Sequence, residues 1–242
     1  MASAERAFLL LAGHMQNELN SLNKVFGWCL YNPRSDHTSP IEGLANNMQA
    51  MIYARVLAGK LLEAWKMLGK AFFGTKLSQR VESKLHPIAQ DALKKINSHF
   101  DKKNKNNAIY RVRNVFAFHY SLKEFDTNWK EAADETTFEL VLGGTVGNNF
   151  HLAAELVANT ALLNGINSHD KADALRTFFD EVQSIASSFT DFLEGTIVAI
   201  LEERLGSGLT MLGREEEIFP TQSYNEIAIP FFFKPVPSSE SA

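Results

Sequence analysis

Apolar residues recur at steps of three and four along most of this chain, and this helical spacing constrains the fold more than any other feature. The longest run predicts a helix over 170–205, with an apolar stripe formed by Leu175, Phe178, Val182, Ile185, Phe189 and Phe192. Similar runs predict helices over 4–31 and over 40–74, the second of which begins with a proline. Such long amphipathic segments predict an all-α fold, a bundle of long antiparallel helices.

Shorter helical segments extend this prediction. The spacing over 77–100 is divided by Pro87, because a proline interrupts the backbone hydrogen bonds of a helix. Helical spacing returns over 108–122 and over 151–163, and Gly165 is expected to end the latter helix.

The period changes between 136 and 150, where a small β-hairpin insertion is predicted. Residues 138–142 resemble a short strand, the glycine pair 143–144 is a turn signal, and 145–146 begin a return strand.

The helical bundle is expected to form a single domain over 1–205. The tail, 206–242, is rich in proline and phenylalanine, and Phe231-Phe232-Phe233 are expected to dock on the core or on a second subunit.

The net charge, the single cysteine and the spacing of the histidines argue against several classes of protein. The net charge of -4 argues against a protein that coats DNA without regard to sequence. Cys29 is the single cysteine, so no internal disulfide can form. The seven histidines lack metal-ligand spacing, and no nucleotide-binding fingerprint occurs, so neither metal nor cofactor is expected. We find no signal peptide, and Glu194 interrupts the apolar stretch 192–201, so a cytoplasmic protein without a membrane span is predicted.

Residues able to do chemistry gather in one stretch, where Arg113 and Asn114 precede His119. Five residues separate the arginine from the histidine. This pattern resembles the Arg-x(4–6)-His motif of the HEPN superfamily, in which a polar residue follows the arginine. These proteins are helical, and many of them are metal-independent endoribonucleases. Others are abortive-infection proteins or the toxin halves of toxin–antitoxin pairs.

The resemblance implies a role for each residue of the motif. His119 would be the general base or acid, since an imidazole titrates near neutral pH. Arg113 would clamp the phosphate in the transition state, and Asn114 would position it. On an ideal helix Arg113 and His119 point about 120° apart and lie about 9 Å apart along the axis. Members of the family bring such groups together by dimerising, so a two-fold homodimer is implied.

A local excess of basic residues precedes the motif. From Lys94 to Arg113 only Asp101 opposes the lysines and arginines, so a phosphate backbone could be steered to this region. RNA contacts are therefore expected from Lys102, Lys103, Lys105, Arg111 and Tyr120. The alternative is a solvated helix end with its usual lysines.

Two interpretations of the motif remain open. In the first, the chain is a ribonuclease of a phage-defence or toxin–antitoxin system, with an antitoxin or another protein as partner. In the second, it is a non-catalytic helical interaction or scaffold protein, because His119 shares an apolar stripe with Ile109, Val112 and Phe116. A helical domain that accompanies a separate nucleotidyltransferase is a third possibility, although the chain has no recognisable transferase carboxylates.

Overall fold

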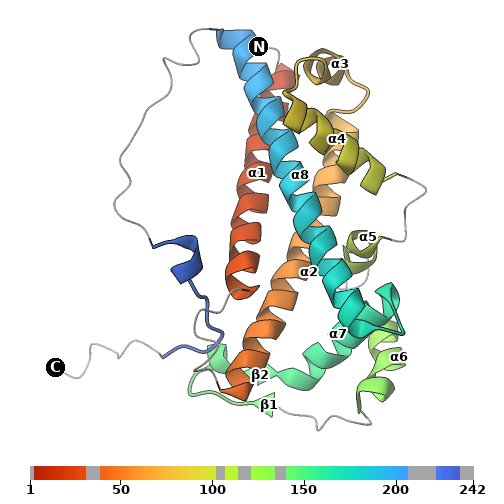
Figure 1. Cartoon of the computed structure of the whole chain (residues 1–242), viewed down its shortest axis with the longest axis vertical. Coiled ribbons are helices and arrows are strands. Elements are labelled where there is room, and N and C mark those ends of the chain that lie inside the picture. The colour runs from red at the N-terminus through yellow and green to blue at the C-terminus, as the bar shows by residue number, and fades with distance from the viewer. Residues whose placement is uncertain are drawn as a thin grey trace, which may run out of the picture.

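Two long amphipathic helices at the start of the chain form one side of the bundle. In the computed structural model α1 spans Ser3–Leu30 and α2 spans Pro40–Ala71, and the two pack along each other (Figure 1). Helix α2 begins where the sequence predicts, because Ser39 and Glu42 form a reciprocal capping box around its first turn. The structure describes residues 3–30, 39–101, 107–113, 121–133, 140–206 and 222–234.

The next helical segment is divided by its proline, as predicted. Helix α3 spans Lys76–Glu82 and α4 spans Pro87–His99. The ring of His86 caps α4, since its Nδ1 accepts a hydrogen bond from the backbone N–H of Ile88 at 3.4 Å. The prolyl ring at the first helical position thus starts a new helix.

Helix α8, Lys171–Leu205, is the central element of the bundle and begins at the N-cap Asp170, as predicted. It runs diagonally across α1 and α2, and it also contacts α4 and α7 (Leu152–Ile166) (Figure 1). Its buried face joins the main core, whose largest fully buried side chains include Phe26, Phe72, Phe178, Phe189 and Phe192. The all-α bundle predicted from the sequence is therefore confirmed.

By length and composition alone, α8 is also apolar enough to cross a membrane. Half of its most apolar window is buried inside the bundle. One such helix is weak evidence for a membrane, because the core helix of an ordinary bundle meets the same criterion.

The helix predicted over 108–122 is described at its start. Helix α5 spans Ala108–Val112, and residues 114–120 lie outside the described part of the chain. Ser121 is not helical, and its hydroxyl accepts a hydrogen bond at 3.3 Å from the first turn of the next helix. That helix, α6, spans Leu122–Ala133 and is not predicted from the sequence.

A small hairpin follows, but its return strand lies later than predicted. Strand β1, Leu140–Val141, pairs antiparallel with β2, Phe150–His151. The residues expected to begin the return strand, 145–146, enter a 3-10 turn instead. The backbone N–H of Asn148 donates to the carbonyl of Thr145 at 3.0 Å, which closes this turn before the chain can pair.

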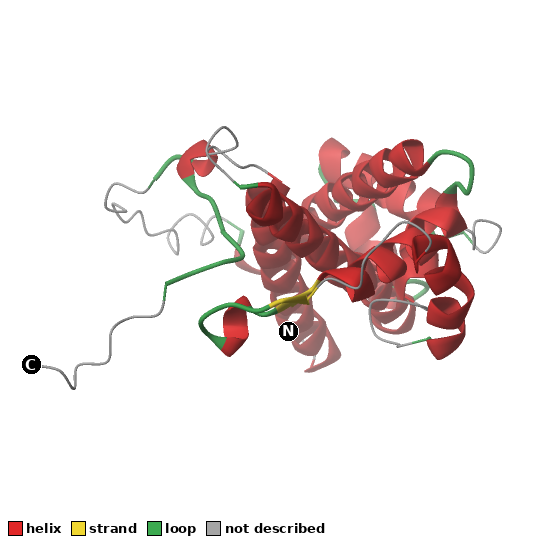
Figure 2. Ribbon diagram, turned by 90° about the horizontal axis from the view of Figure 1, so that it is seen from below, coloured by secondary structure: helices red, strands yellow, loops and turns green. Residues whose placement is uncertain are grey.

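The segment 222–234 lies beside the hairpin loop, to one side of the helices (Figure 2). Phe231 and Phe232 pack against a second, smaller apolar cluster, and the N–H of Phe231 donates to Oδ1 of Asn46 at 2.9 Å. The buried members of this cluster are Ala45, Met48, Phe150 and Leu152. The segment therefore joins the start of α2 to the hairpin.

Candidate functional site

The short helix α5, which leads into the Arg113–His119 motif, is fixed at its N-terminus by side chains. The first N–H groups of a helix lack partners within the helix. Oδ1 of Asn107 accepts from the N–H of Tyr110 at 2.8 Å. The carboxylate of Glu181, on α8, accepts from the N–H of Ala108 at 3.2 Å and from that of Ile109 at 2.9 Å. A carboxylate at this end also complements the helix dipole.

Arg113 fixes the other end of α5 to α2. Its Nε and Nη2 lie 2.8 Å and 2.7 Å from Oε1 of Glu63, and its side chain is 23% exposed. The same carboxylate oxygen accepts from Nζ of Lys66 at 3.1 Å. The guanidinium is thus held at a defined place beside α2 and remains partly open to solvent.

The Glu63 carboxyl stays ionised at neutral pH. Its partial burial acts to raise its pKa, but hydrogen bonds from Lys66 and Arg113 outweigh that effect and hold the pKa below its ordinary value. Because the Glu63 side chain is 44% exposed, its ion pairs contribute more to the position of Arg113 than to the stability of the fold.

Arg111 lies over a different helix from Arg113. Its guanidinium rests on Gly165 of α7, where an added Cβ would overlap Nε of Arg111. Gly165 does not end α7, which continues to Ile166, so the predicted end of this helix is wrong by one residue. The glycine instead permits the close approach of an arginine side chain.

The structure therefore places Arg111 and Arg113 and describes their contacts with α7 and α2. The other residues singled out by the sequence lie outside the described residues: Asn114, His119, Tyr120, Lys102, Lys103 and Lys105.

A groove beside Glu63 was not anticipated from the sequence. It lies between α1 and α2, has a volume of about 170 Å³, and has Glu63 in its lining together with His14, Glu18 and Lys60. Nζ of Lys60 pairs with Oε1 of Glu18 at 2.8 Å, and Nε2 of His14, whose side chain is 66% exposed, lies 3.8 Å from Oε2 of Glu18. The carboxylate that holds Arg113 therefore also borders a groove with a solvent-accessible imidazole.

A second hollow adjoins the carboxylate that caps α5. It lies between α4 and α8 and has a volume of about 330 Å³. His99 lines it, with Nε2 at 3.4 Å from Oε1 of Glu181 and a side chain that is 13% exposed. Among the residues that the structure describes, no group of three or more His, Cys, Asp or Glu side chains is arranged to hold a metal ion.

Cys29 is buried, as its apolar setting predicts. Burial raises the pKa of its thiol above the ordinary value, against a weaker opposing hydrogen bond from Gln49. A thiol with a raised pKa is a poor nucleophile at neutral pH, so Cys29 belongs to the packing of α1.

Comparison with known proteins identifies no relative: no family model matches the chain, and no curated protein and no solved structure matches it.

Proposed function

We propose that this chain is a HEPN-like, metal-independent endoribonuclease, in which Arg113 binds the scissile phosphate and His119 transfers a proton. One observation carries the proposal beyond the motif itself. Carboxylates from two different helices, Glu181 and Glu63, fix the two ends of α5, so the guanidinium of Arg113 is preorganised. Groups held in place before the reaction stabilise a transition state without reorganising at the moment of reaction.

The proposed reaction needs two proton transfers and no metal ion. A base removes the proton of the RNA 2′-hydroxyl, and that oxygen attacks the adjacent phosphorus. The bond from phosphorus to the 5′-oxygen breaks, and an acid protonates the departing oxygen. His119 supplies one of these steps. Arg113 pairs its charge with the phosphate oxygens, and Asn114 orients the phosphate.

Lys102, Lys103, Lys105, Arg111 and Tyr120 contact the RNA in this proposal. The proposed enzyme is cytoplasmic, acts as a two-fold homodimer and belongs to a phage-defence or toxin–antitoxin system, with an antitoxin or another protein as its partner.

The alternative function is that of a non-catalytic interaction or scaffold protein. The ion pair between Arg113 and Glu63 favours it, because that pair joins α5 to α2 and gives the arginine a structural role without any RNA. In that case the loss of either partner would weaken the fold in the same way.

The deciding experiment is cleavage of a structured RNA pool by purified protein in EDTA. We expect the wild type to cut RNA, and we expect His119→Ala and Arg113→Ala each to lose at least about 100-fold in rate, the loss typical of removing one transition-state contact. Arg6→Ala, which removes an exposed arginine of α1, is the matched control and should cut like the wild type.

Glu63→Gln separates the catalytic from the structural role of Arg113. The variant keeps the charge of Arg113 but weakens its anchor, so the rate should stay within about tenfold of the wild type. Equal loss of folding stability in Glu63→Gln and Arg113→Ala, with no cleavage by the wild type at high concentration, would instead support the scaffold function.

A further inference from the structure

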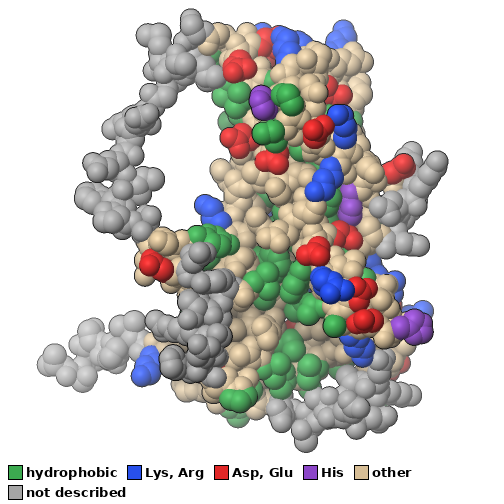
Figure 3. All heavy atoms as spheres, viewed as in Figure 1, with side chains coloured by type: hydrophobic (Ala, Val, Ile, Leu, Met, Phe, Trp, Pro, Cys, Tyr) green, Lys and Arg blue, Asp and Glu red, His purple; other side chains and the backbone are tan. Residues whose placement is uncertain are grey.

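The start of α4 and the C-terminal half of α8 enclose a hollow that shares no lining residue with the groove beside Glu63. Its volume is about 470 Å³. On the face shown in Figure 3, apolar side chains and carboxylates gather over this part of α8. The hollow plays no part in the ribonuclease proposal, so a function of the hollow is independent of that proposal.

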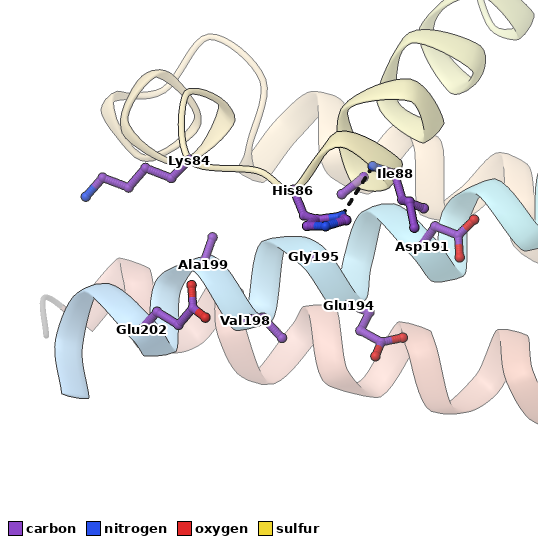
Figure 4. A pocket seen from close by; sticks show the side chains of 10 residues that line it. Lys84, His86, Ile88, Asp191, Glu194, Gly195, Val198, Ala199 and Glu202 are labelled. Atoms are coloured by element: carbon purple, nitrogen blue, oxygen red, sulfur yellow. Dashed lines mark hydrogen bonds between the residues drawn. The ribbon is translucent and has the colours of Figure 1, made fainter. Parts of the chain in front are cut away.

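Small residues bring the two helices together at the base of this hollow. An added Cβ on Gly195 would overlap Cβ of Ala89, so the backbones of α8 and α4 approach closely there. Figure 4 shows the ring of His86 above Gly195, at the point where the chain enters α4. Two aliphatic side chains stay in solvent beside this contact: Ile88 is 62% exposed and Val198 is 39% exposed.

Carboxylates surround these aliphatic side chains. Asp191, Glu194 and Glu202 are spread along α8 and all line the hollow (Figure 4). Asp191 and Glu202 are eleven positions apart, which places them on nearly the same side of the helix and about 16 Å apart along its axis. Val198 lies between them on that side.

The negative charge of the hollow is not balanced within the described part of the chain. No ion pair joins Asp191, Glu194 or Glu202 to a residue that the structure describes. Lys84 also lines the hollow, and its Nζ lies 3.4 Å from Oε1 of Glu203, a carboxylate that Arg80 contacts as well; the three carboxylates still outnumber this one lysine. A phosphate backbone would be repelled here, so the surface does not suit nucleic acid.

We propose that this hollow docks a polypeptide segment of a partner protein in which aliphatic side chains lie between lysine or arginine residues. The aliphatic side chains would cover Ile88 and Val198 and remove them from water. The flanking cations would meet the carboxylates at the two ends, with Asp191 at one end and Glu202 at the other. Such a segment complements the hollow because charged and apolar surface alternate along both.

The probe is a fluorescein-labelled peptide, Lys-Lys-Ala-Leu-Leu-Ala-Lys-Lys, titrated with the full chain and followed by fluorescence polarisation. We expect saturable binding that the triple variant Asp191→Asn, Glu194→Gln, Glu202→Gln weakens roughly tenfold, since each partly solvated ion pair contributes only a few-fold. A peptide with serine in place of both leucines should also bind several-fold more weakly.

The control variant makes the same change of net charge elsewhere: Glu82→Gln, Asp126→Asn and Asp180→Asn, none of which lines the hollow. It should bind the peptide like the wild type, with folding of both variants checked by circular dichroism. The proposal is overturned if the two variants weaken binding equally, since that would indicate attraction by net charge alone. It is also overturned if the leucine and serine peptides bind alike, or if the wild type shows no saturable binding up to about 1 mM, the limit of weak affinity.

Discussion

Glu5 is a carboxylate enclosed by two arginines from distant parts of the chain. The residue is 6% exposed, and its oxygens accept from Nε and Nη2 of Arg204 at 3.0 Å and 2.5 Å. Nη2 of Arg80 lies 3.0 Å away on the other side. The hydrogen bonds from Arg204 outweigh the opposing effect of burial, and with those of Arg80 they lower the pKa of Glu5. One side chain thus joins the start of α1 to α3 and to the end of α8.

Replacing Glu5 with glutamine should destabilise the fold in a pH-dependent way. Because the pKa of Glu5 is lower in the folded than in the unfolded protein, its contribution is fully present above about pH 4.3 and is lost as the pH falls through the folded value. We expect Glu5→Gln to cost roughly 2 kcal/mol at pH 7 and much less at pH 3, measured by urea unfolding.

Asp91→Asn is the control for this experiment. Asp91 pairs with Lys94 at 2.8 Å, but both side chains are about three-quarters exposed. Its loss should cost less than about 0.5 kcal/mol at either pH. A Glu5→Gln cost that is the same at pH 3 and pH 7 would contradict the assignment of the pKa shift to the ion pairs.

Local sequence patterns identify the motif but not what holds it in place. Arg113 stands out in the sequence because Asn114 and His119 follow it. Its partner Glu63 belongs to no motif, and in the sequence of α2 it resembles any other solvent-exposed glutamate. Glu181 caps α5 from 72 residues away in the sequence. Such long-range partners leave no periodic signal, because periodicity reports only neighbours along the chain.

Two glycines inside helices mark places where another part of the chain comes close. Gly165 in α7 accommodates the guanidinium of Arg111, and Gly195 in α8 accommodates Ala89 of α4. Neither glycine ends its helix. Both are therefore explained by packing between elements.

Replacing Gly195 with alanine should destabilise the bundle despite the higher helix propensity of alanine. The new methyl group would overlap Cβ of Ala89, which belongs to a helix and cannot rotate away. We expect a net cost of roughly 1 to 2 kcal/mol by urea unfolding, since overpacking outweighs the gain in propensity.

Gly13→Ala on α1 is the matched comparison, because nothing lies within 4 Å of an added Cβ there. It should stabilise the protein by about 0.5 to 1 kcal/mol. If both alanine variants were stabilising, α4 and α8 would not approach as closely as described.

Elements with strong local signals are predicted well, and those without them are not. Helix α2 starts at its capping box, and α4 starts at Pro87, because caps and prolines act on the adjacent backbone. Helix α6 is missed because it is polar and solvated: Leu122 is 83% exposed and Trp129 is 40% exposed. The return strand is misplaced because a turn over 145–148 takes up residues that would otherwise pair.

For the molecule as a whole, the ribonuclease proposal requires two copies of the chain. On the ideal helix expected from the sequence, Arg113 and His119 point about 120° apart, so the proposed cleft combines motifs from two chains. We expect light scattering to give twice the chain mass of 27.1 kDa at the concentrations used for cleavage. A mass of one chain at those concentrations, with cleavage still present, would contradict the shared cleft.

The larger and the smaller apolar cluster depend on different parts of the chain, and the ribosome makes these parts at different times. The larger cluster is built from helices up to the end of α8, whereas the smaller one also needs Phe231 and Phe232. Asn148, in the hairpin loop, exchanges two hydrogen bonds with Phe233, at 2.7 Å and 3.1 Å. During synthesis the larger cluster can therefore be completed before the segment 222–234 leaves the ribosome, whereas the smaller cluster can be completed only afterwards. We therefore expect this corner of the molecule to close after the bundle has formed.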